Sequence, residues 1–86
     1  SKISALLYTS KSRVLNAINQ TIVYTYFEIG RMIVEEEQNG KERAEYGKNL
    51  LPELSKKLID EFGKGYSVTN LKQMRQFYLI YSIHLQ

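Results

Sequence analysis

The chain has 86 residues, of which 43% are hydrophobic and 24% are charged, and its formal net charge is +3. These values fit one small folded domain and exclude a disordered chain, although a domain of this size buries only about 60% of its unfolded surface. The lack of cysteine excludes disulfides and thiolate metal sites and favours a reducing, cytoplasmic location. The longest uncharged stretch, residues 14–27, is too short to cross a membrane.

The first predicted element is a helix over residues 2–38. Its apolar residues recur at spacings of four and seven, which places them in one stripe along a helix. The stripe consists of Ile3, Leu7, Val14, Ile18, Ile22, Ile29 and Ile33. Residues 21–27, TIVYTYF, favour a strand by propensity, but the helical period continues on both sides without turn residues, so we keep them helical. A helix of about 50 Å exceeds the needs of a small domain, so we expect it to bend, or to project and pair with another surface.

The second predicted element is a helix over residues 47–62. Pro52 is compatible with it if the regular helix begins near Asn49, because a proline in the first turn sacrifices no hydrogen bond. Glu53 and Lys57 have the spacing of a supporting pair on a helix surface. The residues predicted to face inward are Leu51, Leu54, Leu58 and Phe62.

The third predicted element is a helix over residues 67–86, and glycines mark the corners before it. Gly40 is predicted to end the first helix in a left-handed conformation, and Gly63 is predicted to end the second. Ser67 is the predicted N-cap of the third helix, its hydroxyl accepting from a backbone N–H near Asn70. The residues of this helix predicted to face inward are Leu71, Met74, Tyr78, Tyr81 and Leu85.

The predicted architecture is therefore all-α: a long N-terminal helix plus a helix-turn-helix-like pair, three helices without a sheet. We expect one helical domain over residues 1–86. The chain has no initiator Met and stops within the apolar run FYLIYSIHLQ without a helix-stop signal. These two features predict a fragment of a longer protein.

Catalytic residues are sparse. The one histidine, His84, lies in an apolar run, and no acidic residue follows Glu61, so no nucleophile–base constellation can be assembled. Glu35, Glu36 and Glu37 are consecutive, and helical neighbours point about 100° apart, so the three cannot converge on one ion. We expect no enzymatic activity, metal site or cofactor in this chain.

Charge is distributed unevenly along the chain. Residues 1–27 carry three basic residues and no acid, residues 28–62 carry nine acids and six basic residues, and residues 63–86 carry three basic residues and no acid. A polyanion is therefore expected to prefer the two ends of the chain to its middle.

The third helix carries the predicted nucleic-acid site. Four polar residues share one helix face: Thr69, Lys72, Gln73 and Gln76. Arg75 flanks this face, and Lys64 precedes it in a turn that Gly63 and Gly65 allow to be tight. Glutamine can pair with adenine in the major groove, while lysine and arginine reach guanine or phosphate. With about four phosphate contacts the logarithmic salt slope of binding would be about −3.6, so one protomer is expected to bind DNA weakly.

An alternative function is a dimerisation or protein-interaction module. Residues 77–85 are apolar on almost every side, and a helix of that kind must be buried all round. The predicted interface residues are Phe77, Ile80, Tyr81 and Ile83. Their partner would be a second copy in a homo-oligomer, through helix packing, or a domain outside this chain. The two functions can coexist.

Residues 26–81 closely resemble the N-terminal domain of predicted bacterial nucleases of the YhcG type. The matching positions are Phe27, Glu28, Ile29, Gly30 and Arg31; Tyr46 and Gly47; Gly65, Tyr66 and Ser67; Asn70 and Leu71; and Met74, Arg75, Phe77 and Tyr78. The match covers about two-thirds of the chain, and residues 1–25 match only in helical character.

The resemblance implies a helix-turn-helix, DNA-binding domain placed before a metal-dependent catalytic domain of the PD-(D/E)XK type. This chain contains no Glu-x-Lys motif, so the catalytic part lies elsewhere. The resemblance also singles out Glu28 and Arg31, which are spaced to pair, and Gly30, which permits close helix approach. For Arg31 we expect a structural role, tying the first helix to the loop at Glu45–Gly47, rather than a phosphate or partner contact.

Overall fold

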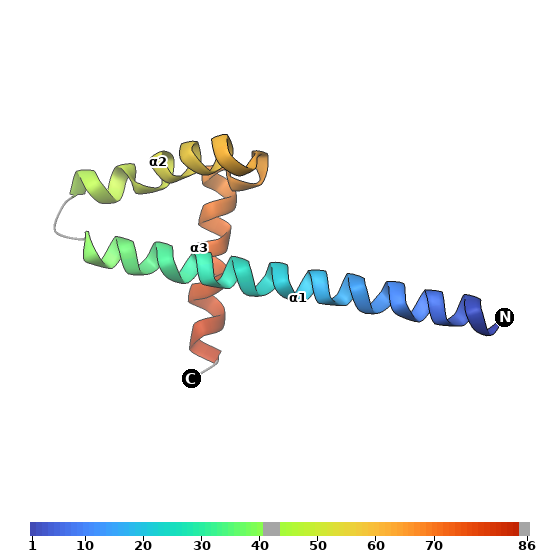
Figure 1. The fold of residues 1–86 in the computed structure, drawn as a ribbon. Helices are drawn as coiled ribbons and strands as arrows, with labels where there is room; N and C mark the ends of the chain where they lie inside the picture. Colours follow the sequence, from blue (N-terminus) through green and yellow to red (C-terminus); the bar gives the residue numbers. More distant parts are fainter. Residues whose placement is uncertain (41–43, 85–86) are drawn as a thin grey trace.

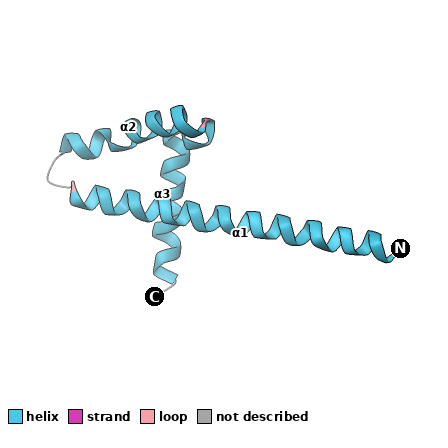
Figure 2. Ribbon diagram, in the orientation of Figure 1, coloured by secondary structure: helices cyan, strands magenta, loops and turns pink. Residues whose placement is uncertain are grey.

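The computed structural model of the chain describes residues 1–40 and 44–84, with only the backbone of residues 44–46 and 84. Its elements are α1 (Lys2–Asn39), α2 (Ala44–Phe62), a short 3₁₀ turn η1 (Lys64–Tyr66) and α3 (Val68–His84). The described residues contain no strand, and Figures 1 and 2 show how the helices are arranged. The all-α prediction is therefore confirmed.

Helix α1 projects from the rest of the molecule. Figure 1 shows it passing α3 and extending well beyond the other two helices, and the molecule measures 63 Å along its longest axis. Residues 2–26 of α1 are exposed throughout, including the stretch TIVYT at residues 21–25. That stretch is helical, as predicted, because the surrounding helical period outweighs its strand propensity. Of the two expected outcomes for so long a helix, the structure shows projection.

The buried core is small and lies where the three helices meet. Among the described residues, its buried apolar side chains are Ile33, Leu51, Leu71 and Met74. Leu71 has no exposed surface, and it belongs to the face of α3 turned toward α1 and α2. Apolar burial contributes about 25 cal/mol per Å², so four such side chains give a limited reserve of stability.

Gly30 allows α1 and α3 to pack at very close range. A Cβ atom at this position would lie 2.2 Å from the carbonyl oxygen of Met74 and 2.8 Å from Cβ of Tyr78. Phe27, one turn earlier on α1, makes an edge contact with the ring of Tyr78 at 5.0 Å between centroids. The predicted close approach at Gly30 is thus confirmed, and it fixes where α3 crosses α1.

The first corner differs from the prediction. Gly40 has φ −97° and ψ 8°, which any residue can adopt, so the predicted left-handed cap there is wrong. The amide of Gly40 donates instead to the carbonyl of Glu36 at 3.0 Å and prolongs the helical hydrogen-bond pattern by one residue. Gly63, by contrast, has φ 103° and donates to the carbonyl of Ile59 at 2.9 Å, so it ends α2 as predicted.

Helix α2 also departs from its prediction. It begins at Ala44, so Pro52 lies in its interior rather than in its first turn. The helix continues through Pro52 although the proline, which has no N–H, cannot donate a backbone hydrogen bond there. Phe62, predicted to face inward, is 68% exposed, and its ring lies edge-on to that of Tyr66 at the end of a groove between α1 and α2. Glu53 and Lys57 form no ion pair within the described part of the chain, so that prediction is wrong as well.

Helix α3 begins as predicted and is less buried than predicted toward its end. The backbone N–H of Asn70 donates to the hydroxyl of Ser67 at 3.1 Å, which confirms the N-cap. Tyr78 is half-buried, whereas Tyr81 is 50% exposed, so the inward prediction for Tyr81 is wrong. Its ring packs on Phe77 of the same helix and borders an open hollow lined by Val23 and Tyr24 of α1. Leu85 lies outside the described residues. Among the described helices, none is both long enough and apolar enough to cross a membrane.

Candidate nucleic-acid interface

The corner between α2 and α3 is held by side chains from both helices. Ser55 of α2 is buried and its hydroxyl donates to the carbonyl of Tyr66 at 2.8 Å. From α3, the side-chain amide of Asn70 donates to the carbonyl of Gly65 at 3.1 Å. With the Ser67 cap, these bonds fix both the path of η1 and the start of α3. The polar residues that follow are therefore carried on a rigid support.

The structure brings the predicted polar residues together on the outer side of α3. Thr69, Lys72, Gln73 and Gln76 are all exposed. They lie on the helix face opposite Leu71 and Met74, because residues three, four and seven apart share a face. We call this set the α3 polar face.

Two lysines give this side of the molecule its positive charge. Lys72 lies on the α3 polar face, and Lys64 is exposed in η1 just before it. Neither lysine forms an ion pair with a described residue. Both ammonium groups are thus available to an anion.

Arg75 has a different environment. It is half-buried on the flank of α3, and its Nη1 contacts Oε2 of Glu37 on α1 at 2.5 Å. The ion pair joins residues 38 positions apart and ties α3 to the end of α1. A phosphate contact by Arg75, predicted from the sequence, would require it to leave or share Glu37.

The predicted interface residues extend the exposed side of α3 toward its end. Phe77 is half-buried and its ring lies 4.7 Å from that of Tyr81. Ile80 and Ile83 are 45% and 73% exposed. Three of the four predicted residues are therefore accessible to a partner, while Phe77 packs mainly inside the molecule, against Phe27.

Arg31 pairs along its own helix. Its guanidinium contacts Glu28 at 2.6 Å and Glu35 at 2.8 Å, which confirms the predicted pairing with Glu28. The hydrogen bonds that Arg31 donates to Glu28, and then to Glu35, raise the pKa of Arg31 above its ordinary value. The side chains of Glu45 and Tyr46 lie outside the described part, so the expected tie to that loop stays a prediction.

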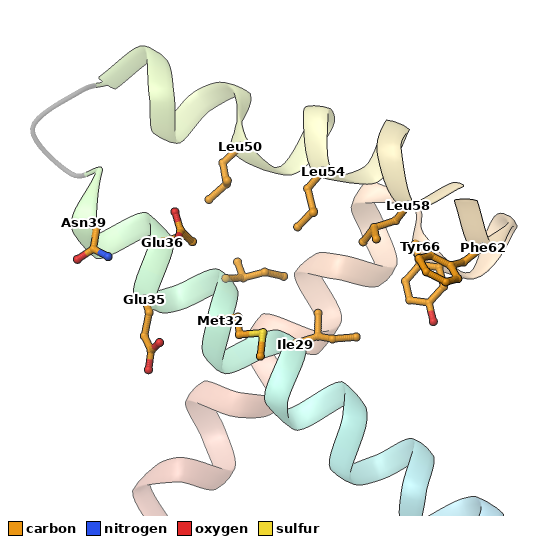
Figure 3. Close-up of a pocket in the computed structure, with 11 residues that line it drawn as sticks. Ile29, Met32, Glu35, Glu36, Asn39, Leu50, Leu54, Leu58, Phe62 and Tyr66 are labelled. Atoms are coloured by element: carbon orange, nitrogen blue, oxygen red, sulfur yellow. The ribbon is translucent and has the colours of Figure 1, made fainter. Parts of the chain in front are cut away.

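An apolar groove separates α1 from α2. Figure 3 shows Leu50, Leu54 and Leu58 pointing from α2 toward Ile29 and Met32 on α1. Phe62 and Tyr66 lie together at one end, and the groove has a volume of about 660 Å³. We call it the α1–α2 groove. Sequence reasoning missed it because periodicity predicts which residues face inward, and it does not predict that α2 stands away from α1.

Comparison with known proteins identifies the family. Residues 2–86 match the family described as the DUF1016 N-terminal domain. The chain belongs to the DUF1016 N-terminal domain family.

A curated relative of this DUF1016 N-terminal domain is "Putative nuclease YhcG" of Escherichia coli (strain K12), which is 43% identical over 76 residues. The alignment covers 88% of this chain and 20% of the relative, so the chain spans about a fifth of that protein. No solved structure matches the chain. The resemblance seen in the sequence is thus confirmed at the level of the family.

Proposed function

We propose that this domain binds duplex DNA through the α3 polar face and so positions a nuclease domain that lies elsewhere in a longer protein. The observation that carries the proposal is the exposure of Lys72, Gln73 and Gln76 on one rigid helix face, with Lys64 beside them. The name of the relative, a nuclease, supports a nucleic-acid partner. We also propose that α2 and α3 act as a helix-turn-helix pair, in which α2 supports α3 and α3 enters the major groove.

The residues take separate roles in the proposed complex. Gln73 and Gln76 present amide groups that can pair with adenine edges in the major groove. Lys64 contacts phosphate, and Lys72, nearer the glutamines, reaches either guanine or phosphate. Thr69 lies at the start of α3, where its hydroxyl can donate a hydrogen bond to a DNA phosphate. Arg75 holds α3 against α1 through Glu37 and contributes to phosphate binding only when that pair opens.

The strength of binding follows from the number of free cations. Lys64, Lys72 and one basic residue of α1 give three phosphate contacts and a logarithmic salt slope of about −2.7. Release of Arg75 from Glu37 would add a fourth contact and steepen the slope to about −3.6. Either value describes weak binding, so a useful affinity requires a second copy or the remainder of the longer protein.

The test is a fluorescence anisotropy titration of a labelled DNA duplex at several salt concentrations. Lys72→Ala is expected to reduce the salt slope by about 0.9, and Gln73→Ala with Gln76→Ala to reduce discrimination between sequences. Lys56→Ala, at an exposed lysine of α2, is the matched control and should leave the slope unchanged. Absence of salt-dependent binding to the duplex overturns the proposal. Equal slopes for Lys72→Ala and the unsubstituted chain would move the binding site to another face.

A further inference from the structure

The exposed part of α1 has an apolar stripe that nothing in the described chain covers. Ile3 is 72% exposed, Leu7 64% and Val14 59%. An isolated helical arm of this kind has little stability of its own, because most helical stability in proteins comes from packing an apolar face. The stripe therefore needs a partner surface.

The same stripe continues into the α1–α2 groove. Successive helical residues are turned by about 100°, which puts Leu7, Ile18 and Ile29 on one side of α1. Ile29 lines the groove, together with Met32 and Ile33 from the same helix. Helix α3 crosses mainly on a different side, at Phe27, Gly30 and Val34, and it reaches the stripe at Ile33, which packs with Leu71 and Met74. A second helix lying along the stripe would therefore enter the groove beside Ile29 and Met32.

The spacing of the stripe reads the same in both directions. Its residues are Ile3, Leu7, Val14, Ile18, Ile22, Ile29 and Ile33, with steps of 4, 7, 4, 4, 7 and 4. Two copies of α1 laid antiparallel with Ile18 at the centre place Leu7 opposite Ile29 and Val14 opposite Ile22. Ile3 comes level with Ile33, which is only 2% exposed, so Ile3 meets the groove residues around Ile33 rather than Ile33 itself. A slip by one heptad would instead set Ile18 opposite Lys11 or Thr25.

Charge favours the antiparallel direction. Residues 1–27 carry three basic residues and no acid, whereas residues 28–40 carry four glutamates and one arginine. In the register centred on Ile18, residues 28–35, with Glu28, Glu35 and Arg31, lie opposite residues 1–8, where the one charged side chain is Lys2. Parallel pairing would instead set the +3 segment of one copy beside the +3 segment of the other, and the −3 segment beside the −3 segment.

Lys11 specifies the register further. It lies on the same side of α1 as the stripe, between Leu7 and Val14, and the antiparallel register places it opposite Thr25. The hydroxyl of Thr25 donates to the carbonyl of Thr21 at 2.7 Å, which leaves its oxygen able to accept from the lysine. A single polar position of this kind fixes register in helix pairs at some cost in stability.

From these observations we propose that two copies of this chain form a two-fold symmetric dimer in which their α1 helices pair antiparallel along the stripe. The N-terminal part of each α1 then fills the α1–α2 groove of the other copy, with its Ile3 and Leu7 covered by Leu54 and Leu58. The contact is the same on both copies and closes on itself, so it gives a dimer rather than a filament. The proposal is independent of DNA binding, and its test contains no nucleic acid.

The first experiment measures association by sedimentation equilibrium. Leu7→Lys is expected to weaken the dimer at least about a hundredfold, because each dimer loses two buried leucines. Leu6→Lys is the matched control: Leu6 is 65% exposed and Leu7 64%, but Leu6 lies about 100° away around the helix. Circular dichroism confirms that both variants are folded. A chain that stays monomeric at all concentrations, or equal effects of the two variants, overturns the proposal and assigns the stripe to another partner.

The second experiment tests the direction of pairing with cysteines, which the chain lacks. Ile18→Cys lies on the two-fold axis and is expected to cross-link to itself under mild oxidation. Leu7→Cys alone should not cross-link, whereas Leu7→Cys combined with Ile29→Cys should. Self-cross-linking of Leu7→Cys as fast as that of Ile18→Cys would demonstrate parallel pairing and refute the antiparallel arrangement.

Discussion

Replacing Gly30 by alanine tests the packing that holds α3 on α1. The added Cβ would lie 2.2 Å from the carbonyl oxygen of Met74 and 2.8 Å from Cβ of Tyr78. Neither atom is the end of a flexible side chain, so relief requires the two helices to separate. Overpacking costs about 1–3 kcal/mol, and we expect the upper end, because separation also loosens Met74 and Ile33, two of the four core residues. Alanine favours the helix over glycine by about 1 kcal/mol, so the free energy of unfolding should fall by about 2 kcal/mol in total.

The assay is thermal unfolding followed by circular dichroism. For a domain of this size, a net loss of about 2 kcal/mol lowers Tm by roughly 8–16 °C. The matched control is Gly47→Ala in α2, where a Cβ meets nothing within 4 Å, and where alanine should raise Tm by a few degrees. All samples are compared at one protein concentration, because the Tm of an associating chain depends on it. A Gly30→Ala variant that melts at or above the temperature of the unsubstituted chain would refute the close crossing.

Two further substitutions test the corner and the α1–α3 ion pair. Ser55→Ala should lower the free energy of unfolding by about 1–3 kcal/mol in a urea titration, because it leaves the carbonyl of Tyr66 without its donor; an unchanged midpoint would show that the hydrogen bond does not hold η1. Glu37→Gln should lower stability by about 1 kcal/mol and, by releasing Arg75, should steepen the salt slope of DNA binding by about 0.9. Glu53→Gln removes the same charge from an exposed site and is the control; identical slopes for the two variants would contradict a phosphate role for Arg75.

The features that the sequence predicted best are those set by local chemistry. The cap at Ser67 and the corner at Gly63 depend on residues within a few positions of each other, and both are found in the structure. The helical state of residues 21–27 followed from the period on either side. The failure at Gly40 has the same origin, because a glycine permits a left-handed conformation without requiring one.

What the sequence did not predict depends on contacts between distant segments. Arg75 has the same appearance in the sequence whether it is free or held by Glu37, and only the crossing of α3 over α1 brings the two together. Phe62 has the period of a core residue, but its exposure depends on the distance between α2 and α1. The polar residues of α3 were predictable as a set, because their common face follows from helical spacing and from the burial of Leu71 and Met74 opposite them.

Because α1 runs without a break through its crossing with α3, the number of residues before the crossing determines the direction in which the N-terminal stripe faces. Deleting one residue from the exposed stretch 21–26 would leave the core intact but rotate the N-terminal part of the stripe by about 100°, away from the groove that it is proposed to fill. Adding or removing seven residues rotates it by only about 20°. Relatives of this chain can therefore differ in arm length by whole heptads far more readily than by one or two residues, and aligned sequences would reveal that rule as gaps in multiples of seven.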